Sequence, residues 1–560
     1  MSISIYRRLL FSSLGAATVI SVADAQTAPQ VSVPDAGKLL QQVQPPTLPA
    51  VPQAAPSLKV APEPTSGPSS SVAFDLRLIR ITGNTVFDGA RLHALVASGE
   101  GQRLTLGELE TLAGRITAYY QNHGYPLSRA IIPAQSIRDG VVVFQVVEAR
   151  YGAVRIHNGS RVSDKLLSST LASLKPGAPI AAGALDRTLL LASDIPGVTV
   201  DATLQPGATV GTSDLDATVT RRRSPPFYVL ADNSGNRYTG RVRVGGGLDL
   251  INPLGFGDVL AVNGLTTGNR LQYGRASYDL LLNGIGTRAG VAISALGYKL
   301  GRDVRQLDAH GSAQIASGWV KQPLLRNKLA NISAGIEFDH KRLHDRVDVI
   351  DSRNDRHLDN WVFSLSGDVR DGLLGGGISV WGLGWTRGRT HFDDPTAAAL
   401  DAVSARTSGN FSKWNLNASR LQYITPRTTL YVSGAAQWSN ANLDTAEKVA
   451  IGGPDSVRAY DIGVLSADRA YLETIELRRD FSRRWHAKLF VDAAQVKLNH
   501  RPWVGGDNMA DLAGGGAGLA WDGPDGLRLE STVAARFQHE DGIAIRQAAV
   551  RGWVSASKAF

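Results

Sequence analysis

Apolar and polar side chains alternate with a period of two through the C-terminal three-fifths of this chain, residues 223–560, and this alternation limits the folds that the chain can adopt. In one segment Leu529 and Val533 alternate with Arg528 and Glu530. Successive side chains of a β-strand point to opposite faces, so the pattern predicts strands with one apolar and one polar face. Such strands form either a membrane barrel, whose apolar face points outward to lipid, or a soluble barrel, whose apolar face points inward and forms the core.

The first residues of the chain indicate export. Arg7 and Arg8 precede an apolar run, and Ala23-Asp24-Ala25 provides the small residues of a cleavage site. The pattern predicts a secretory signal peptide over 1–25 and a mature chain that begins at Gln26. The apolar run is shorter than the ~20 residues of a membrane-spanning helix, and no window of about 18 apolar residues follows it.

Export combined with a long series of alternating strands favours a membrane barrel over a soluble β fold. Phe560 supports this preference, because it ends a strand-like segment that contains Trp553 and Val554. At roughly 21 residues per strand with its share of loop, the region accommodates about 16 strands, within the range of membrane barrels. We therefore predict a transmembrane antiparallel β-barrel of about 16 strands over 223–560, with lipid outside and water inside.

Composition and motifs exclude several classes of site. The chain has no Cys, so disulfides and thiolate metal ligands are not available, and its His residues are scattered. The net charge of +9 is not concentrated in a basic stretch interleaved with aromatic residues, as nucleic-acid binding would require. The segment 284–289 fits a loose G-x-G-x-x-A pattern, but without a surrounding βαβ unit it is predicted to be a barrel turn. We expect no enzyme activity, cofactor, metal ion, nucleotide or nucleic acid.

Two short segments follow the signal peptide. Within 26–44, a helix is predicted near 34–44, with Leu39, Leu40 and Val43 on one side. Residues 45–70 are rich in proline and cannot form a core, so they are predicted to be an extended linker. The helix is therefore expected to be tethered to the chain rather than integrated in a domain.

Two similar small α+β units are predicted between the linker and the barrel, over 71–149 and 150–222. Each follows a strand–helix–helix–strand–strand plan. In the first unit, Thr105 and Glu108 form the T-x-x-E capping box of a helix. The remaining elements are expected at 74–82, 130–133 and 141–147 in the first unit, and at 153–157, 163–174, 181–193, 198–204 and 214–220 in the second.

Several barrel segments match the motifs of a known family. They are Asp232-Asn233-Ser234-Gly235 with Thr239-Gly240, Asn252-Pro253-Leu254-Gly255 with Gly257-Asp258, Gly452-Gly453 before Val457-Arg458-Ala459-Tyr460, and Phe490-Val491-Asp492. In this order they resemble the first barrel hairpin, the next turn, the loop signature VRGY and the F-x-D strand of the two-partner secretion transporters of the POTRA–barrel superfamily (POTRA, polypeptide-transport-associated). These are the haemolysin-activator and filamentous-haemagglutinin transporters. Ala459 departs from the usual Gly, at a cost of about 1 kcal/mol if that position needs positive φ.

The resemblance implies both a location and a function. It places the barrel in the bacterial outer membrane, in contact with lipid, and the two POTRA-like units in the periplasm. It implies secretion of a large partner exoprotein, such as a haemolysin or adhesin, that is unfolded in the periplasm. It further implies that the helix in 26–44 plugs the barrel. A count of two POTRA-like units favours secretion, because relatives with more units mostly assemble membrane proteins.

The resemblance also implies that Arg458 pairs with Asp492 and fixes a loop around 445–469 inside the barrel. Spacing supports the position of one partner. If the apolar face with Leu489 and Val491 meets lipid, Asp492 points into the lumen. An ion pair between guanidinium and carboxylate can be bidentate and directional. The alternative is an exposed Arg458 on a solvated loop.

Exposed strand edges of the POTRA-like units offer a means of capturing unfolded polypeptide by β-augmentation. Arg221, Arg222 and Arg223 lie at the junction with the barrel and contact either the client, lipid head groups or only solvent. Two other functions remain open for the whole chain, an outer-membrane protein assembly factor and a passive porin or solute channel. A secreted β-rich enzyme is a more distant alternative.

Overall fold

The structure is a computed structural model that describes residues 33–43, 57–60, 73–537 and 547–560. The predicted signal peptide over 1–25 and most of the predicted linker over 45–70 lie outside the described residues. Within the linker range, Ser57–Val60 forms strand β1, which pairs in parallel with β8 from Asp201 to Leu204. Part of this range is therefore the edge strand of a sheet.

The first front-end unit, here called unit 1, packs two helices against a small sheet. The strand predicted over 74–82 is divided into β2 and β3 by an interruption at Leu76 and Arg77. Helix α3 begins at the predicted capping box, because Thr105 and Glu108 each accept the other's backbone N–H. Strands β3, β6 and β5 form the sheet in that order, with β2 paired to β4. The elements are β2 Ala73–Asp75, β3 Leu78–Thr82, α2 Gly89–Ala94, β4 Arg103–Thr105, α3 Leu106–Asn122, β5 Arg129–Ile131 and β6 Val141–Val147.

Unit 2 has the same general plan and a larger sheet, in the order β1-β8-β9-β7. One face of this sheet and the two helices enclose an apolar core that includes Leu167, Leu189 and Val200. The elements are β7 Arg150–Gly159, α4 Asp164–Leu171, α5 Ala182–Ser193, β8 Val198–Pro206 and β9 Thr212–Arg221.

A buried carboxylate joins the two units. Glu148 accepts hydrogen bonds from the backbone N–H groups of Thr85 and Val86 and from the Tyr120 hydroxyl, at 2.7–2.9 Å. Arg150, the first residue of β7, adds an ion pair at 2.9 Å. Burial opposes ionisation of Glu148, but the hydrogen bonds from Thr85 and its neighbours outweigh burial and lower its pKa below the ordinary 4.5. The ionised form of Glu148 therefore stabilises this junction.

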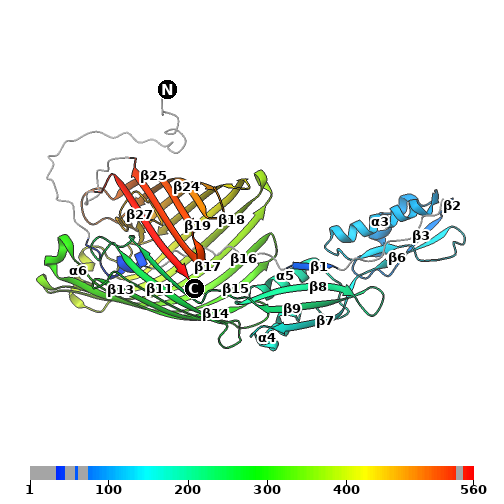
Figure 1. Ribbon diagram of the computed structural model, residues 1–560, viewed down its shortest axis with the longest axis horizontal. Coiled ribbons are helices and arrows are strands. Elements are labelled where there is room, and N and C mark those ends of the chain that lie inside the picture. Colours follow the sequence, from blue (N-terminus) through cyan, green and yellow to red (C-terminus); the bar gives the residue numbers. More distant parts are fainter. Residues whose placement is uncertain (1–32, 44–56, 61–72, 538–546) are drawn as a thin grey trace, which may run out of the picture.

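The C-terminal region is a closed antiparallel barrel of sixteen strands, in agreement with the predicted number (Figure 1). Neighbouring strands follow chain order except that β23 comes after β20, and β27 closes the barrel against β10. The strands are β10 Phe227–Asp232, β11 Arg243–Ile251, β12 Val259–Thr266, β13 Leu271–Leu281, β14 Arg288–Lys299, β15 Ala309–Arg326, β16 Ala330–Val347, β17 Ser352–Asp371, β18 Gly377–Phe392, β19 Gly409–Thr425, β20 Thr428–Ser439, β23 Arg469–Asp480, β24 Trp485–Lys497, β25 Met509–Asp522, β26 Leu527–Arg536 and β27 Val550–Ala559.

The apolar face of the strands points outward. On β24, Leu489 and Val491 are 61% and 47% exposed, whereas Phe490 and Asp492 are buried on the inner face. An outward apolar band with a polar interior is the pattern of a membrane barrel. Among the described residues, no helix combines the length and the apolar character that crossing a bilayer would require.

The two ends of the barrel differ. Unit 2 contacts one end, where Arg326 pairs with Asp194 at 2.7 Å and the backbone N–H of Ser163 donates to the carbonyl of Gly255. The short turns between strands lie at this end, and unit 1 extends farther from the barrel (Figure 1). The longer connections, including helix α6 Pro395–Val403, lie at the opposite end. A polypeptide that entered from the front-end units would therefore cross from the short-turn end to the long-loop end.

Helix α1, Ala36–Val43, lies inside the barrel. Its Ala36, Leu39 and Leu40 are at most 1% exposed and pack against barrel side chains such as Leu343 and Phe411. The expectation of a helix that is merely tethered is therefore wrong. Composition gave no signal for this packing, because the partner residues come from barrel strands hundreds of positions away; only the family resemblance implied a helix inside the barrel.

Candidate functional site

The connection between β20 and β23 folds into the lumen. Its arms form a short hairpin of β21 Val449–Ile451 and β22 Leu465–Ala467, and the segment between them reaches the barrel wall. Gly452 and Gly453 have φ of +96° and +102° and turn the chain at the end of β21. Apolar contacts hold the tip, because Val457, Ala459 and Tyr460 are buried together with wall residues Phe490, Val496 and Leu512. The loop tip is thus packed against the wall like a protein core.

Arg458 and Asp492 are in direct contact. The Arg458 guanidinium donates from Nε to Asp492 Oδ2 at 2.8 Å and from Nη2 to Oδ1 at 2.6 Å. The backbone N–H of Arg458 also donates to Oδ2, at 3.1 Å, and the Thr474 hydroxyl donates to Oδ1 at 3.0 Å. Both charged side chains are buried. A bidentate pair of this kind is directional, so it fixes both the position and the orientation of the loop tip.

Two further wall residues contact the Arg458 guanidinium, and of these only Phe490 was predicted from the sequence. Glu476 on β23 accepts from Nη1 at 2.5 Å and is itself paired with Arg478. The Phe490 ring lies under the guanidinium, 3.5 Å from its carbon to the ring centroid. The register of β23 and β24 explains why Glu476 is near, because it lies opposite Phe490. Spacing within β24 could not predict Glu476, because Glu476 lies on the neighbouring strand β23.

The Ala459 position does not require glycine here. Its φ is not positive, in contrast to that of Gly452 and Gly453. Its methyl group lies where Gly514 on β25 has no side chain, and a Cβ built on Gly514 would lie 2.5 Å from the Ala459 Cβ. The extra methyl group of the loop is accommodated by a glycine in the wall.

Other contacts hold the tip on both sides of Arg458. Asp461 forms ion pairs with Arg241 and Arg551, at 2.7 and 2.6 Å. The Trp553 indole N–H donates to the carbonyl of Arg458 at 2.8 Å. The loop tip therefore bridges the first hairpin, β23–β24 and the last strand, which come from both sides of the barrel closure.

The arm that precedes β21 carries a second buried anchor. Glu447 accepts ion pairs from Lys341 and Lys413 on the wall, at 2.7 and 2.8 Å. Burial alone would raise the pKa of Glu447, but the two ammonium groups outweigh it and hold the pKa at about 2. This carboxylate, which lies in the loop outside the strands, stays ionised.

The plug helix α1 contacts both the wall and the loop. Arg356 on β17 is buried among three carboxylates, with Asp444 at 2.6 Å, Asp345 at 2.7 Å and Asp35 at 3.6 Å. Asp345 also accepts from the first backbone N–H of the helix, and Asp35 accepts from the Thr445 hydroxyl, both at 2.8 Å. The plug, the loop and the wall therefore share one network of polar contacts.

Of the predicted plug residues, Leu39 and Leu40 are buried on the wall side and Val43 is partly buried. The helix begins after Asp35, whose carboxylate caps the N–H of Lys38 at 2.9 Å. Near the other end of the helix, the Gln42 side chain accepts from Asn236 at 3.0 Å. Both α1 and the loop tip therefore pack against inward-facing residues of the barrel wall.

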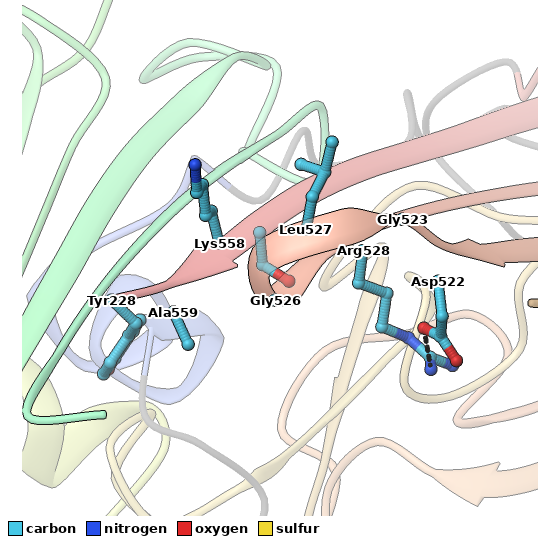
Figure 2. Close-up of a pocket in the computed structure, with 9 residues that line it drawn as sticks. Tyr228, Asp522, Gly523, Gly526, Leu527, Arg528, Lys558 and Ala559 are labelled. Atoms are coloured by element: carbon cyan, nitrogen blue, oxygen red, sulfur yellow. Dashed lines mark hydrogen bonds and ion pairs between the residues drawn. The ribbon is translucent and has the colours of Figure 1, made fainter. Parts of the chain in front are cut away.

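A hollow of about 420 Å³ lies apart from these contacts, where β26 and β27 meet β10 at the unit-2 end (Figure 2). Tyr228, Leu527 and Lys558 line it, and the ion pair of Arg528 with Asp522 lies at one side. It does not reach Arg458 or the plug, so it is separate from the site described above.

A closed sixteen-stranded barrel with an internal helix, an inward loop and two front-end α+β units defines an outer-membrane transporter barrel. The model of the family "Haemolysin secretion/activation protein ShlB/FhaC/HecB" matches residues 211–521, and that of the ShlB-type POTRA domain matches 74–149. The chain belongs to the haemolysin secretion/activation family, and it is an outer-membrane transporter of two-partner secretion, with its POTRA domains in the periplasm.

Individual relatives agree with this membership. The heme/hemopexin transporter protein HuxB of Haemophilus influenzae is 25% identical over 469 residues, which cover 82% of each chain. The outer membrane transporter CdiB of Escherichia coli is 24% identical over 418 residues, 72% of this chain and 68% of CdiB. The solved structure of CdiB from Escherichia coli superposes with a TM-score of 0.71 at 22% identity and covers 90% of this chain and 94% of CdiB. CdiB from Acinetobacter baumannii gives 0.63 at 16% identity, with 91% and 95% covered.

Proposed function

We propose that this transporter captures an unfolded exoprotein with its POTRA domains, releases α1 from the lumen, and passes the client to the cell surface through the barrel. The observation that carries the proposal is that α1 and the loop tip both lie in the lumen and are held there by side-chain contacts, while no described strand of the barrel pairs with either of them. Such contacts can be exchanged for contacts with a client. The client is a large exported protein such as a haemolysin or adhesin, and several relatives bear the names of hemolysin or heme/hemopexin transporters.

The division of labour follows the order of the chain. Residues 1–25 direct export, 26–44 plug the lumen, 45–70 link the plug to the POTRA domains over 71–149 and 150–222, and 223–560 form the barrel in lipid. Because Ser57–Val60 is paired with β8, only residues 44–56 separate α1 from the unit-2 sheet. A segment of about 13 residues spans at most roughly 45 Å when extended, more than the ~30 Å of the hydrocarbon layer, so the plug can leave the lumen while it stays attached.

Capture of the client uses an edge of a POTRA sheet. β7 is an end strand of the unit-2 sheet. Its first residues, Arg150 and Tyr151, bond to the segment 177–180, and beyond them it pairs with β9 alone among the described strands. The opposite end of this sheet is already covered by β1. An extended client segment adds to the free edge of β7 through main-chain hydrogen bonds, which require no fixed client sequence.

Arg458 and Asp492 keep the inward loop in place while the pore is at rest and during passage. Val457, Ala459 and Tyr460 supply the apolar contacts of the tip, Gly452 and Gly453 its turn, and Phe490 the surface under Arg458. Loss of the pair is expected to misplace the loop and to impair secretion more than it impairs insertion of the barrel.

The test is co-expression with the exported protein encoded next to this gene, followed by assay of the culture medium. Secretion that depends on this chain supports the proposal. Normal surface exposure of the partner in cells that lack this chain would refute secretion, and depletion of unrelated barrel proteins in those cells would support an assembly factor instead. Removal of residues 34–43 is expected to raise single-channel conductance in planar bilayers, and unchanged conductance would contradict the plug.

A further inference from the structure

The outer surface of strands β16 to β19 carries a row of aromatic rings. Phe363, Trp385 and Trp414 lie in register on three adjacent strands, with ring centroids 5.4 and 6.1 Å apart. Phe363 and Trp414 are exposed, as expected for lipid-facing residues. Aromatic girdles mark the level where the hydrocarbon of a bilayer meets its head groups. This row therefore fixes the height of one membrane interface.

The row belongs to the external interface. The strands continue from it toward the long-loop end, away from the turn that contains Lys328, which pairs with Asp186 of unit 2 at 2.7 Å. POTRA domains lie in the periplasm, so the long-loop end faces outward from the cell. The lipid at this height is the outer leaflet.

Basic side chains occupy the positions directly beyond the aromatic row. On β18, Arg387, Arg389 and His391 follow Trp385 on the same face, and all three are exposed. At about 3.4 Å per residue and a tilt of about 40°, Arg387 and Arg389 lie roughly 5 and 10 Å above the row. The head-group layer is about 5–8 Å thick on each side of the hydrocarbon. Arg387 therefore lies within it, and the Arg389 backbone lies just beyond it, within reach of its long side chain.

Adjacent strands extend the basic surface. Arg342 and His340 on β16 and His357 on β17 lie beside it, and the ring centroids of His357 and His391 are 4.9 Å apart. The patch also contains carboxylates, but Asp359 is bonded to His340 at 2.7 Å and Asp393 to His357 at 2.8 Å. We call the set Arg342, His340, His357, Arg387, Arg389 and His391 the outer basic patch.

Arg387 and Arg389 differ from other lipid-side arginines, because neither guanidinium has a side-chain partner among the described residues. At the opposite interface of the same strands, Arg420 is held by Asp371 at 2.8 Å. Two unpaired guanidinium groups at head-group height match an anion that comes from the membrane itself. Phosphate suits them, because a guanidinium can bind two of its oxygens at once.

We propose that the outer basic patch binds the phosphate groups of the phosphorylated glycolipid of the outer leaflet, the lipid A part of lipopolysaccharide. This inference rests on the proposed placement of the barrel in lipid and adds a specific lipid and its site. Acyl chains pack along the aromatic row, and the glucosamine phosphates lie against Arg387 and Arg389. The bound glycolipid covers the wall of β16 to β18, the strands whose inner face holds Arg356 and the plug.

Binding is measured on the full-length protein in detergent by native mass spectrometry, with phosphorylated lipid A as the probe. Each basic residue near an anionic lipid surface contributes about fivefold, so R387Q/R389Q is expected to weaken binding about 30-fold. The matched control is R483Q/R484Q, which removes the same charge from the exposed turn between β23 and β24 at the periplasmic end. It is expected to leave binding of lipid A unchanged.

Two competitor lipids identify the source of the anion. Dephosphorylated lipid A and phosphatidylglycerol are both expected to bind the wild-type protein at least tenfold more weakly than phosphorylated lipid A. Equal binding of the dephosphorylated lipid, or an equal loss in R483Q/R484Q, would overturn the proposal. Phosphatidylglycerol that bound as tightly would assign the patch to anionic lipid in general and would also overturn it.

Secretion of the partner protein, measured in parallel, separates this inference from the proposed function. A wild-type protein that binds lipid A but secretes nothing would refute the secretion mechanism and leave the lipid site intact. The lipid site alone would be refuted if the wild-type protein secreted its partner but bound lipid A no more tightly than R387Q/R389Q.

Discussion

Replacement of Asp492 by asparagine is expected to release the inward loop from the barrel wall. The substitution keeps the shape of the side chain and removes its charge. Asp492 accepts three N–H groups of Arg458 and one hydroxyl, so the charge is neutralised almost entirely by the loop. The introduced side-chain amide would also present its N–H₂ group toward a guanidinium that can only donate.

The structure sets the size of the effect. Removing one partner of a buried ion pair costs about 3–5 kcal/mol, because the other charge stays buried and uncompensated. Here Glu476 remains to neutralise Arg458, at 2.5 Å, so the lower limit of about 3 kcal/mol applies. The ratio of released to docked loop is then expected to rise roughly 100-fold.

Because the chain contains no Cys, a single introduced thiol reports on the loop without background. Val457 is 1% exposed beside Arg458, so a V457C thiol reacts with maleimide only when the tip leaves the wall. Labelling of D492N/V457C is expected to be roughly 100-fold faster than that of V457C, provided that the loop redocks faster than it reacts.

Asp480 provides the matched control, because it is a carboxylate of the neighbouring strand that pairs with His486 and not with the loop. D480N/V457C is expected to label at the rate of V457C. The reasoning fails if D492N leaves the rate unchanged, or if D480N accelerates labelling as much as D492N does.

Three further predictions concern the wall, the plug and the POTRA domains. G514A is expected to reduce secretion, because its new methyl group overlaps that of Ala459. In the same secretion assay, A459G/G514A is expected to recover part of the loss. Equal secretion by G514A and A459G/G514A would contradict the steric argument. Leu40→Ala removes a buried contact that contributes about 2–5 kcal/mol, so it is expected to raise the open fraction of channels in planar bilayers. Leu400→Ala, at an exposed position, is expected to leave the open fraction unchanged. The pKa of Glu148 is lower in the folded state than the ordinary 4.5. Its ionisation therefore stabilises the fold at pH values above about 4.5, and this stabilisation is lost as the pH falls from there toward the folded pKa. In chemical denaturation of the full-length protein, E148Q is therefore expected to lower the unfolding midpoint of the POTRA domains at pH 7 and to make little difference at pH 3; an equal loss at both values would refute the linkage.

The strand pattern and the helix cap at Thr105 could be predicted from local sequence because their physical causes are local. Alternation along β24 already places Leu489 and Val491 on the lipid face and Asp492 on the other, since side chains of a strand alternate regardless of its neighbours. The capping box at Thr105 is likewise complete within four residues. Length and strand period together were enough for the number of strands.

The motif around Arg458 identified a loop but not the whole environment that receives it. Glu476 lies on the strand next to Asp492, and Gly514, which accepts the Ala459 methyl group, lies on the strand beyond. Which residues of neighbouring strands face one another depends on barrel register, and a single sequence does not encode register in any one segment.

An exported barrel of about sixteen strands with a lipid-facing exterior could be inferred from the order of residues, because these properties depend on period, length and the alternation of side chains along one strand. Closure of the barrel was needed to show which wall residues α1 packs against, that Arg356 joins the plug, the loop and the wall, and that Arg387 and Arg389 lie above an aromatic row without a side-chain partner among the described residues. Each of these depends on residues far apart in the chain, which only closure of the barrel brings together.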